Sequence, residues 1–348
     1  MRGKSDKTLT RLVPVLLTWF DQSARSLPWR TARGVKRDAY RVWLSEIMLQ
    51  QTTVPHAAPY FIDFTTRWPT VDHLAAAKDE DVMQAWAGLG YYARARNLLK
   101  CARDVAARGG FPETEAALRT LPGIGPYTAG AIAALAFGER TPAVDGNAER
   151  VFARLLAMQE DWPAAKKRIA AIVRELVPAS RPGDFAEALM DLGATVCTPK
   201  RPDCHVCPLA ELCLARIEGA PEQYPVKPEK AARPERFGAV YVLRRAGFVW
   251  LVRRAPSGLL GGMLALPTSA WSETSAHTAA PLEADWRRVG DVRHVFTHFS
   301  LKLDVWTADV ADADLPEGVW ADEAQTAGLP TVFAKAARLG GVNVPKRR

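Results

Sequence analysis

Four of the five cysteines fall within seventeen residues and are the clearest candidate metal ligands in the sequence. They are Cys197, Cys204, Cys207 and Cys213, separated by six, two and five residues. In a reducing cytosol, such a group binds metal rather than forming disulfides. Four thiolates suit an iron–sulfur cluster. They also suit zinc, although zinc ribbons usually use two distant Cys-x-x-Cys pairs and this loop has one.

The segment YRVWLSEIMLQQT, residues 40–52, has apolar residues at helical spacing and one carboxylate, Glu46. A helical glutamate is most often exposed, but Leu44, Ile47 and Met48 leave this segment little polar face. Apolar surroundings raise the pKa of a carboxylic acid and make it a usable general acid near neutral pH. The segment therefore predicts a helix that carries a candidate acid.

A second carboxylate, Asp145, lies in the segment VDGN, residues 144–147. It follows apolar residues and precedes Gly146, so we expect it where a buried segment ends. Considered alone, it predicts an Asx turn or the N-cap of a helix over 148–158.

The stretch LPGIG, residues 121–125, joins two helical patterns. Gly123 and Gly125 leave a turn without Cβ atoms, so another molecule can approach the backbone. Pro126 suits the first turn of the next helix, whose free N–H groups suit a phosphate. On a chain with a net charge of +8, this pattern resembles the helix-hairpin-helix of DNA-binding proteins, which implies a contact with one phosphate and none with the bases.

The length of 348 residues suits two domains. We expect an all-helical domain over 1–220, an extended proline-containing linker over 221–236 and an α+β domain over 237–348. In the last domain, 237–254 predicts two strands that turn at Ala246–Gly247, and 299–310 alternates apolar and polar residues. No apolar run is long enough to span a bilayer and no signal peptide is evident, so a cytoplasmic protein is expected.

A hairpin at LPGIG followed by VDGN resembles the endonuclease III superfamily of helix-hairpin-helix base-excision glycosylases. SEIMLQQT, residues 45–52, and GLGYYARARNL, residues 88–98, are similar to its adenine-specific branch, the MutY-type adenine DNA glycosylases. The resemblance covers nearly the whole chain. It implies an enzyme that releases adenine opposite 8-oxoguanine, and also opposite guanine, from double-stranded DNA. It also implies a [4Fe–4S] cluster on the four cysteines.

The resemblance assigns the chemistry to three residues. Glu46 is the acid that protonates adenine, and Asp145 stabilises the oxocarbenium-like sugar that remains, with Tyr127 nearby. Relatives that also cut the strand have a lysine at the position of Tyr127, in GPYTAG. Because tyrosine cannot form a Schiff base with the sugar, we expect a monofunctional glycosylase.

Other residues are assigned to DNA and to the two bases of the mispair. Arg30 and Glu187 resemble adenine-pocket residues, although the loop after Arg30 is a few residues longer than is usual in the family. The residues expected to contact DNA are Gly123 and Gly125 of the hairpin, Leu49 and Gln51 beside the opened base stack, and Tyr91 as an aromatic wedge.

The C-terminal part resembles a Nudix-like domain in PSGLLGGMLALP, residues 256–267. The acidic metal-binding helix of Nudix hydrolases is missing, so we expect recognition rather than hydrolysis. HVFTHFS, residues 294–300, resembles the loop with which adenine glycosylases recognise 8-oxoguanine. Phe296, Thr297 and His298 stand where the family usually has Phe-Ser-His, which keeps the hydroxyl group.

Two alternatives stay open. A thymine-mismatch glycosylase shares the helical core, but such relatives usually end after the cluster. A non-enzymatic DNA-binding iron–sulfur protein would use the hairpin alone and leave Glu46 and Asp145 unexplained. Those two residues are 99 positions apart, so their meeting rests on the resemblance. A monomer that does not associate with a membrane is expected.

Overall fold

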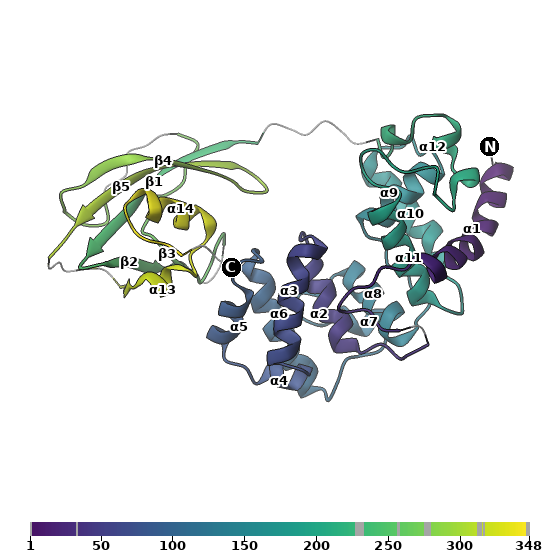
Figure 1. Cartoon of the computed structure of the whole chain (residues 1–348), viewed down its shortest axis with the longest axis horizontal. Coiled ribbons are helices and arrows are strands. Elements are labelled where there is room, and N and C mark those ends of the chain that lie inside the picture. Colours follow the sequence, from purple (N-terminus) through teal and green to yellow (C-terminus); the bar gives the residue numbers. More distant parts are fainter. Residues whose placement is uncertain are drawn as a thin grey trace. The chain divides into compact units, whose positions relative to one another are not determined.

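The computed structural model has a helical part followed by a part built on a β-sheet, which confirms the predicted fold class (Figure 1). It divides into two compact units, Met1–Ala85 with Arg94–Glu229 and Trp86–Ala93 with Lys230–Arg348. The sequence-based boundaries at 220 and 237 stay a prediction, and residues 227–232 of the expected linker lie outside the described residues. The structure describes residues 2–32, 34–226, 233–255, 258–274, 280–311, 315 and 317–345.

The chain up to residue 226 is helical apart from its connecting turns. Helices are present in the expected segments 40–52 and 148–158. The first ends at Leu49, because the backbone turns at Gln50, and the second ends at Leu155. The helices of this part are α1 (Arg2–Ser23), α2 (Ala39–Leu49), α3 (Val54–Arg67), α4 (Val71–Ala75), α5 (Asp79–Trp86), α6 (Tyr92–Ala107), α7 (Glu115–Leu118), α8 (Pro126–Phe137), α9 (Gly146–Leu155), α10 (Trp162–Leu176), α11 (Pro182–Thr195), η1 (Ala210–Leu212), α12 (Leu214–Ile217) and η2 (Pro221–Gln223).

Helix α8 is the central element of this part. Every residue from Thr128 to Ala136 is buried, and most are alanine or glycine. Because these side chains are short, α2, α7 and α11 pack directly against α8. At Gly130, an added Cβ would collide with the carbonyl oxygen of Pro142. Gly130 therefore lets the segment that leads to Asp145 lie close against α8.

The predicted hairpin is present between α7 and α8. Gly123 has φ +77°, and an added Cβ would lie 2.8 Å from Cβ of Asn97. Both the backbone and the packing thus require glycine there. At Gly125, which N-caps α8, an added Cβ would meet nothing within 4 Å. The backbone at this helix start is open to another molecule.

The C-terminal part is built on a sheet of order β3-β2-β1-β5-β4, in which β6 also pairs with β2. β1 and β5 are parallel, and the other pairs are antiparallel. The predicted turn at Ala246–Gly247 joins β1 to β2, with both residues at positive φ as hairpin turns prefer. The strands are β1 (Glu235–Arg245), β2 (Phe248–Arg253), β3 (Leu264–Ala265), β4 (Arg287–Val295), β5 (Ser300–Asp309) and β6 (Val319–Ala321).

Strand β5 buries Leu301, Leu303 and Val305 while the residues between them are more exposed, as the alternating sequence predicts. Helix α14 (Thr331–Leu339) packs on β1 and β4 and buries Phe333 in the same core (Figure 1). Its sequence, TVFAKAARL, contains no carboxylate, and the other described helix here, α13 (Glu323–Thr326), is one turn long. Residues 256 and 257 of the expected Nudix-like loop lie outside the described residues.

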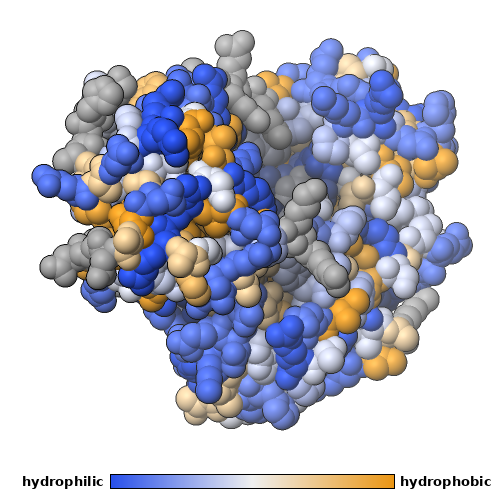
Figure 2. Space-filling view, turned by 60° about the vertical axis from the view of Figure 1, so that its left-hand side comes forward, coloured by the Kyte–Doolittle hydropathy of each residue, from blue (hydrophilic) through white to orange (hydrophobic). Residues whose placement is uncertain are grey.

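The molecular surface is mixed in character. Figure 2 shows mostly hydrophilic residues on the face it presents, with hydrophobic residues in small scattered groups. Single exposed apolar side chains such as Ile62 and Ile217 are ordinary on protein surfaces. Among the described helices, none combines the length and apolar character needed to cross a membrane.

Candidate active site

Helix α2 carries Glu46 in a buried position, as the apolar pattern predicts. Asp38 caps the helix by accepting a hydrogen bond from the backbone N–H of Tyr40 at 2.8 Å. The Glu46 residue is only 7% exposed, and burial raises the pKa of its carboxyl to about 7. This pKa of about 7 already includes a hydrogen bond with Tyr127, which lowers the pKa, and the charge of nearby Asp145, which raises it. Glu46 can therefore hold a proton near neutral pH.

Tyr127 and Asp145 lie close enough to Glu46 to shift the pKa of its carboxyl. Tyr127 lies in the first turn of α8, and its hydroxyl donates a hydrogen bond to the Glu46 carboxylate. Burial and the two carboxylates raise the pKa of Tyr127 well above its usual value. Tyr127 is therefore a neutral donor, which leaves Glu46 as the group here that can exchange a proton near pH 7.

Asp145 is the N-cap of α9, so the simple interpretation of this residue is confirmed. Its Oδ1 accepts hydrogen bonds from the backbone N–H groups of Asn147 (3.0 Å) and Ala148 (2.8 Å). Its Oδ2 accepts one from the Asn147 side chain at 2.7 Å. Three donors and the start of a helix hold a negative charge at a fixed place. This arrangement can stabilise a cation that forms beside it.

Glu46 lines a pocket together with Leu49, Arg30 and Glu187. Arg30 forms a two-pronged ion pair with Asp191, at 2.6 and 2.8 Å, and its Nε lies 3.4 Å from Oε1 of Glu187. The pocket therefore combines an acid that can donate a proton with a fixed carboxylate and a guanidinium. These three groups can form hydrogen bonds with the polar edge of a planar ring.

Asp191, which no sequence pattern had singled out, is completely buried and also binds Arg25. The signal was present, because Asp191 stands inside the apolar helical segment EALMDLGATVC. A carboxylate in such a place requires a charged partner. The partner arginines are remote in sequence, so the pattern indicates that Asp191 needs a charged partner but does not identify the residues that supply it.

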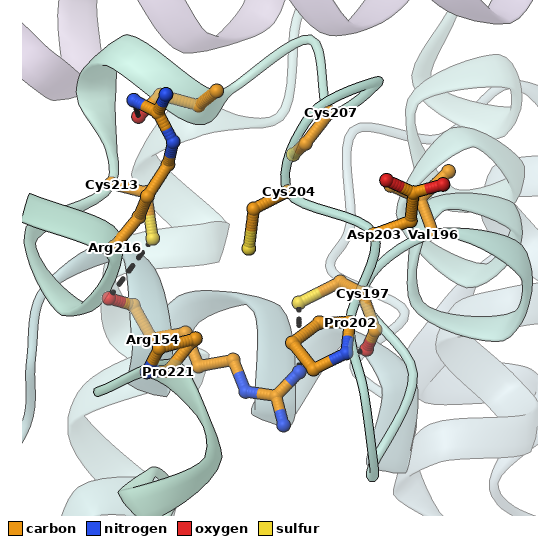
Figure 3. Close-up of a pocket in the computed structure, with 11 residues that line it drawn as sticks. Arg154, Val196, Cys197, Pro202, Asp203, Cys204, Cys207, Cys213, Arg216 and Pro221 are labelled. Atoms are coloured by element: carbon orange, nitrogen blue, oxygen red, sulfur yellow. Dashed lines mark hydrogen bonds between the residues drawn. The ribbon is translucent and has the colours of Figure 1, made fainter. Parts of the chain in front are cut away.

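The four cysteines come together around one pocket, as their spacing predicts. Figure 3 shows the side chains of Cys197, Cys204, Cys207 and Cys213 around a common space. Among the described residues, no three His, Cys, Asp or Glu side chains are placed to hold a single metal ion. A pocket lined on several sides by thiols fits a cluster that takes one thiolate at each iron. Burial raises the pKa of the Cys207 thiol to about 12, so this thiol keeps its proton near neutral pH unless a bound metal replaces the proton, which is then released to solvent.

Helix α9 joins the cysteine pocket to Asp145. Arg154 is 1% exposed and donates to Sγ of Cys197 at 3.3 Å and to the carbonyl of Thr198 at 2.7 Å. Thiolates at this pocket would balance its buried charge. One turn earlier, Arg150 donates to the carbonyl of Cys197 (2.8 Å) and to Oδ1 of Asn147 (2.8 Å). The same helix thus contacts the cysteine loop and presents Asp145 at its start.

Two of the residues expected to contact DNA are exposed and have an unusual backbone conformation, whereas Leu49 is partly buried within α2. Gln51 is exposed just after α2, with φ +54°, and Tyr91 is 49% exposed with φ +49°. A residue with a Cβ takes up such a conformation at a cost of about 1 kcal/mol, and such strain is common at functional sites. Arg94 fixes the end of α2 by donating to the carbonyls of Ile47 (2.9 Å) and Gln50.

The expected 8-oxoguanine loop connects β4 to β5. Phe296 is half-buried and stacks on Trp271 with ring centroids 6.0 Å apart, and its N–H bonds the carbonyl of Phe299 at 2.9 Å. Thr297 and His298 are exposed at the tip. A turn anchored by aromatic packing thus presents a hydroxyl and an imidazole to solvent.

Family models match three parts of the chain. Residues 44–179 match "HhH-GPD superfamily base excision DNA repair protein", residues 197–213 match "Iron-sulfur binding domain of endonuclease III" and residues 239–339 match "NUDIX domain". The fold and the site therefore define a base-excision DNA glycosylase with an iron–sulfur cluster and a Nudix-like domain.

Individual relatives narrow this class. The chain is 35% identical to the adenine DNA glycosylase of Homo sapiens, with 93% of this chain and 73% of that protein covered. It is 41% identical to the adenine DNA glycosylase of Mycolicibacterium smegmatis, over 59% of this chain and 70% of that protein. The solved structure of a thermostable thymine-DNA glycosylase is 28% identical with a TM-score of 0.55, and the match covers 61% of this chain and 98% of that one. The chain belongs to the adenine DNA glycosylase family.

These matches decide between the alternatives that the sequence left open. The chain is an enzyme, a glycosylase of DNA repair, and not a binding protein alone. The iron–sulfur match over 197–213 selects the iron–sulfur cluster over zinc. The thymine-mismatch alternative is not favoured, because the relatives from Homo sapiens and Rattus norvegicus, which match 93% of this chain, are adenine DNA glycosylases.

Proposed function

We propose that the enzyme removes adenine paired with 8-oxoguanine, and with guanine, and leaves the DNA strand intact. The observation that carries the proposal is a buried acid at a pocket, with a hydroxyl and a second carboxylate close enough to shift its pKa. A buried acid with a pKa of about 7, Glu46, is hydrogen-bonded to Tyr127 and lies near the fixed carboxylate of Asp145. An acid and a separate anion are what release of a base from a sugar requires.

In the proposed reaction, adenine leaves the base stack and enters the pocket lined by Arg30 and Glu187. Glu46 donates its proton to a ring nitrogen, most simply N7, so that adenine departs as a neutral base. The C–N bond breaks, and the sugar becomes a cation that the Asp145 carboxylate stabilises. Water then adds to the sugar and yields an abasic site.

The DNA is proposed to be held by surfaces that read no sequence. The open backbone at Gly125, with Gly123 forming the turn, suits a phosphate. Leu49, Gln51 and Tyr91 would fill the space that the flipped base leaves. When bound, the iron–sulfur cluster would tie the loop 197–213 together through its four cysteines. We further propose that the enzyme acts as a cytoplasmic monomer.

We assign selection of 8-oxoguanine to Phe296, Thr297 and His298. The lesion differs from guanine by an oxygen at C8 and a proton at N7, and a hydroxyl with nearby polar groups can bond both. Thr297 and His298 are exposed at the turn, and the Thr297 hydroxyl lies within hydrogen-bond distance of the Tyr91 hydroxyl, at 3.2 Å. Guanine would leave these groups unpaired, which gives the preference its physical origin.

The double substitution Thr297→Ala with His298→Ala should reduce the preference for 8-oxoguanine over guanine roughly thirtyfold, because each of the two lost contacts costs about 1 kcal/mol. Release of adenine opposite guanine should change little. Single-turnover rates and affinities on the two duplexes, at one salt concentration, measure this. Thr331→Ala, which removes an exposed threonine of α14, is the matched control. An unchanged preference in the double variant contradicts the assignment.

A further inference from the structure

The loop between Arg30 and α2 brings a second arginine, Arg37, to the pocket. One nitrogen of Arg37, Nη2, lies 2.7 Å from Oε2 of Glu187 and 2.7 Å from Oδ1 of Asp184. Its other terminal nitrogen donates to the carbonyl of Leu135 at 3.5 Å. Arg33 of the same loop lies outside the described residues. This loop therefore contributes a charge that contacts Glu187 directly.

We propose that Arg37 is a positioning residue that makes the pocket select a 6-amino purine over a 6-oxo purine. It does so by holding Glu187 in one orientation as a hydrogen-bond acceptor. The proposal rests on the proposed function, in which Glu187 faces the flipped base. Adenine carries an amino donor at C6, whereas hypoxanthine carries an oxygen there, which a carboxylate repels.

Arg37 is the principal partner of Glu187. The Glu187 side chain is 11% exposed, and each of its oxygens faces one arginine. Arg30 approaches Oε1 only to 3.4 Å, because its terminal nitrogens are engaged with Asp191. Arg37 makes the short, charge-assisted contact. Without Arg37, the orientation of Glu187 would depend on the longer contact alone.

The packing around Arg37 leaves room for its side chain. Gly183 lies in the first turn of α11, and an added Cβ would lie 2.8 Å from Nη1 of Arg37 and 2.9 Å from the carbonyl oxygen of Ala134. The Arg37 side chain is 20% exposed. A mostly buried guanidinium whose space depends on a glycine is a constructed contact rather than a solvated surface charge.

The charges around Glu187 explain why one arginine can matter. Burial raises the pKa of Glu187, and Asp184 raises it too, whereas Arg30 and Arg37 lower it. Glu46, on α2, is a further negative group that interacts with Glu187. Loss of Arg37 should raise the pKa of Glu187 further, so a larger fraction would carry a proton. A protonated Glu187 can donate a hydrogen bond to the 6-oxygen of hypoxanthine, so the pocket no longer discriminates between a 6-amino and a 6-oxo purine.

The test is the ratio of adenine to hypoxanthine release in Arg37→Met, measured in single turnover opposite 8-oxoguanine. We expect the ratio to fall roughly tenfold, as for loss of one charged hydrogen bond. It should recover partly as the pH rises and Glu187 ionises. Because both bases need Glu46, the ratio cancels the titration of that acid. Arg37→Lys keeps a cation, so its ratio should lie between the ratios of the parent enzyme and of Arg37→Met. If the Met variant folds poorly, the ratio in Arg37→Lys provides the test.

Two further variants assign the effect. Arg181→Met removes an arginine that bonds Asp184 at 2.7 Å and also pairs with Asp21, and it should leave the ratio unchanged. In a Glu187→Gln background, Arg37→Met should lower the ratio no further. An equal loss in that background, or a ratio independent of pH, overturns the inference. If Glu187→Gln lowers the ratio and Arg37→Met does not, this inference alone fails. If neither does, the assignment of Glu187 fails as well.

Discussion

Replacement of Glu46 by glutamine should lower the rate of adenine release by about 10²–10⁴-fold, which is the usual contribution of a general acid. DNA binding should be retained. Glutamine keeps the shape of the side chain and can still accept the hydrogen bond from Tyr127, but it has no acidic proton for adenine. Single-turnover rates and binding to the same duplex separate the two effects. Glu175→Gln, at an exposed position of α10, is the matched control. Near-normal release would remove Glu46 from the mechanism.

The same substitution should stabilise the fold above pH 7. The pKa of Glu46 is raised from about 4.5 to about 7 in the folded protein, so the native state holds this proton more tightly than the unfolded chain. Below about pH 4.5 both states are protonated and Glu46 costs nothing. As the pH rises to 7, the unfolded chain releases this proton while the native state still holds it. This difference lowers the free energy of unfolding by about 3 kcal/mol. Denaturant unfolding at pH 4.5 and pH 8 should therefore show a gain for Glu46→Gln only at the higher pH.

Replacement of Tyr127 by lysine should create strand-cleaving activity that the parent enzyme lacks. Tyr127 lies beside Glu46 and Asp145, so an amine at this position would be close to the sugar carbon from which adenine departs. The amine can attack the aldehyde of the abasic sugar and lose water, which gives an imine. Borohydride reduces this imine to a stable amine, so the variant should form a covalent protein–DNA adduct.

The control for this variant is Tyr127→Met, which removes the hydroxyl without adding an amine. It should form no adduct, so any adduct in the lysine variant is due to its amine. Denaturing gels measure both the adduct and the cut strand. A parent enzyme that is trapped as efficiently as the lysine variant would show that the monofunctional interpretation is wrong.

The sequence predicted those parts of the fold that depend on local pattern. Helical periodicity located α2, and alternation located β5, because each buries one face of a regular element. The hairpin was predictable because Gly123 needs a left-handed backbone. The end of α2 at Leu49 was not predicted, because the segment continues the apolar and polar pattern to 52 while the carbonyls are instead capped by Arg94 from α6.

The candidate site was less accessible from pattern alone. No local sequence pattern predicts that Glu46 and Asp145 approach each other. Their approach depends on the small residues of α8, which belong to a third segment of the chain and let the neighbouring segments pack closely. The sequence around Asp145 correctly predicts that this residue caps a helix. That prediction says nothing about a second role for Asp145. Arg37 was missed because an arginine in a basic loop is usually solvated. Its burial depends on the close approach of Gly183, which no sequence pattern announces.

The most direct test of the account is the identity of the base that the purified enzyme releases. Duplexes with adenine opposite 8-oxoguanine, guanine or thymine, and with thymine opposite guanine, would be incubated with the enzyme, and free bases identified by chromatography. We predict free adenine from the first two, faster opposite 8-oxoguanine, with the strand intact until alkali is added. Release of thymine from the thymine–guanine duplex, or DNA binding without any free base, would contradict the account.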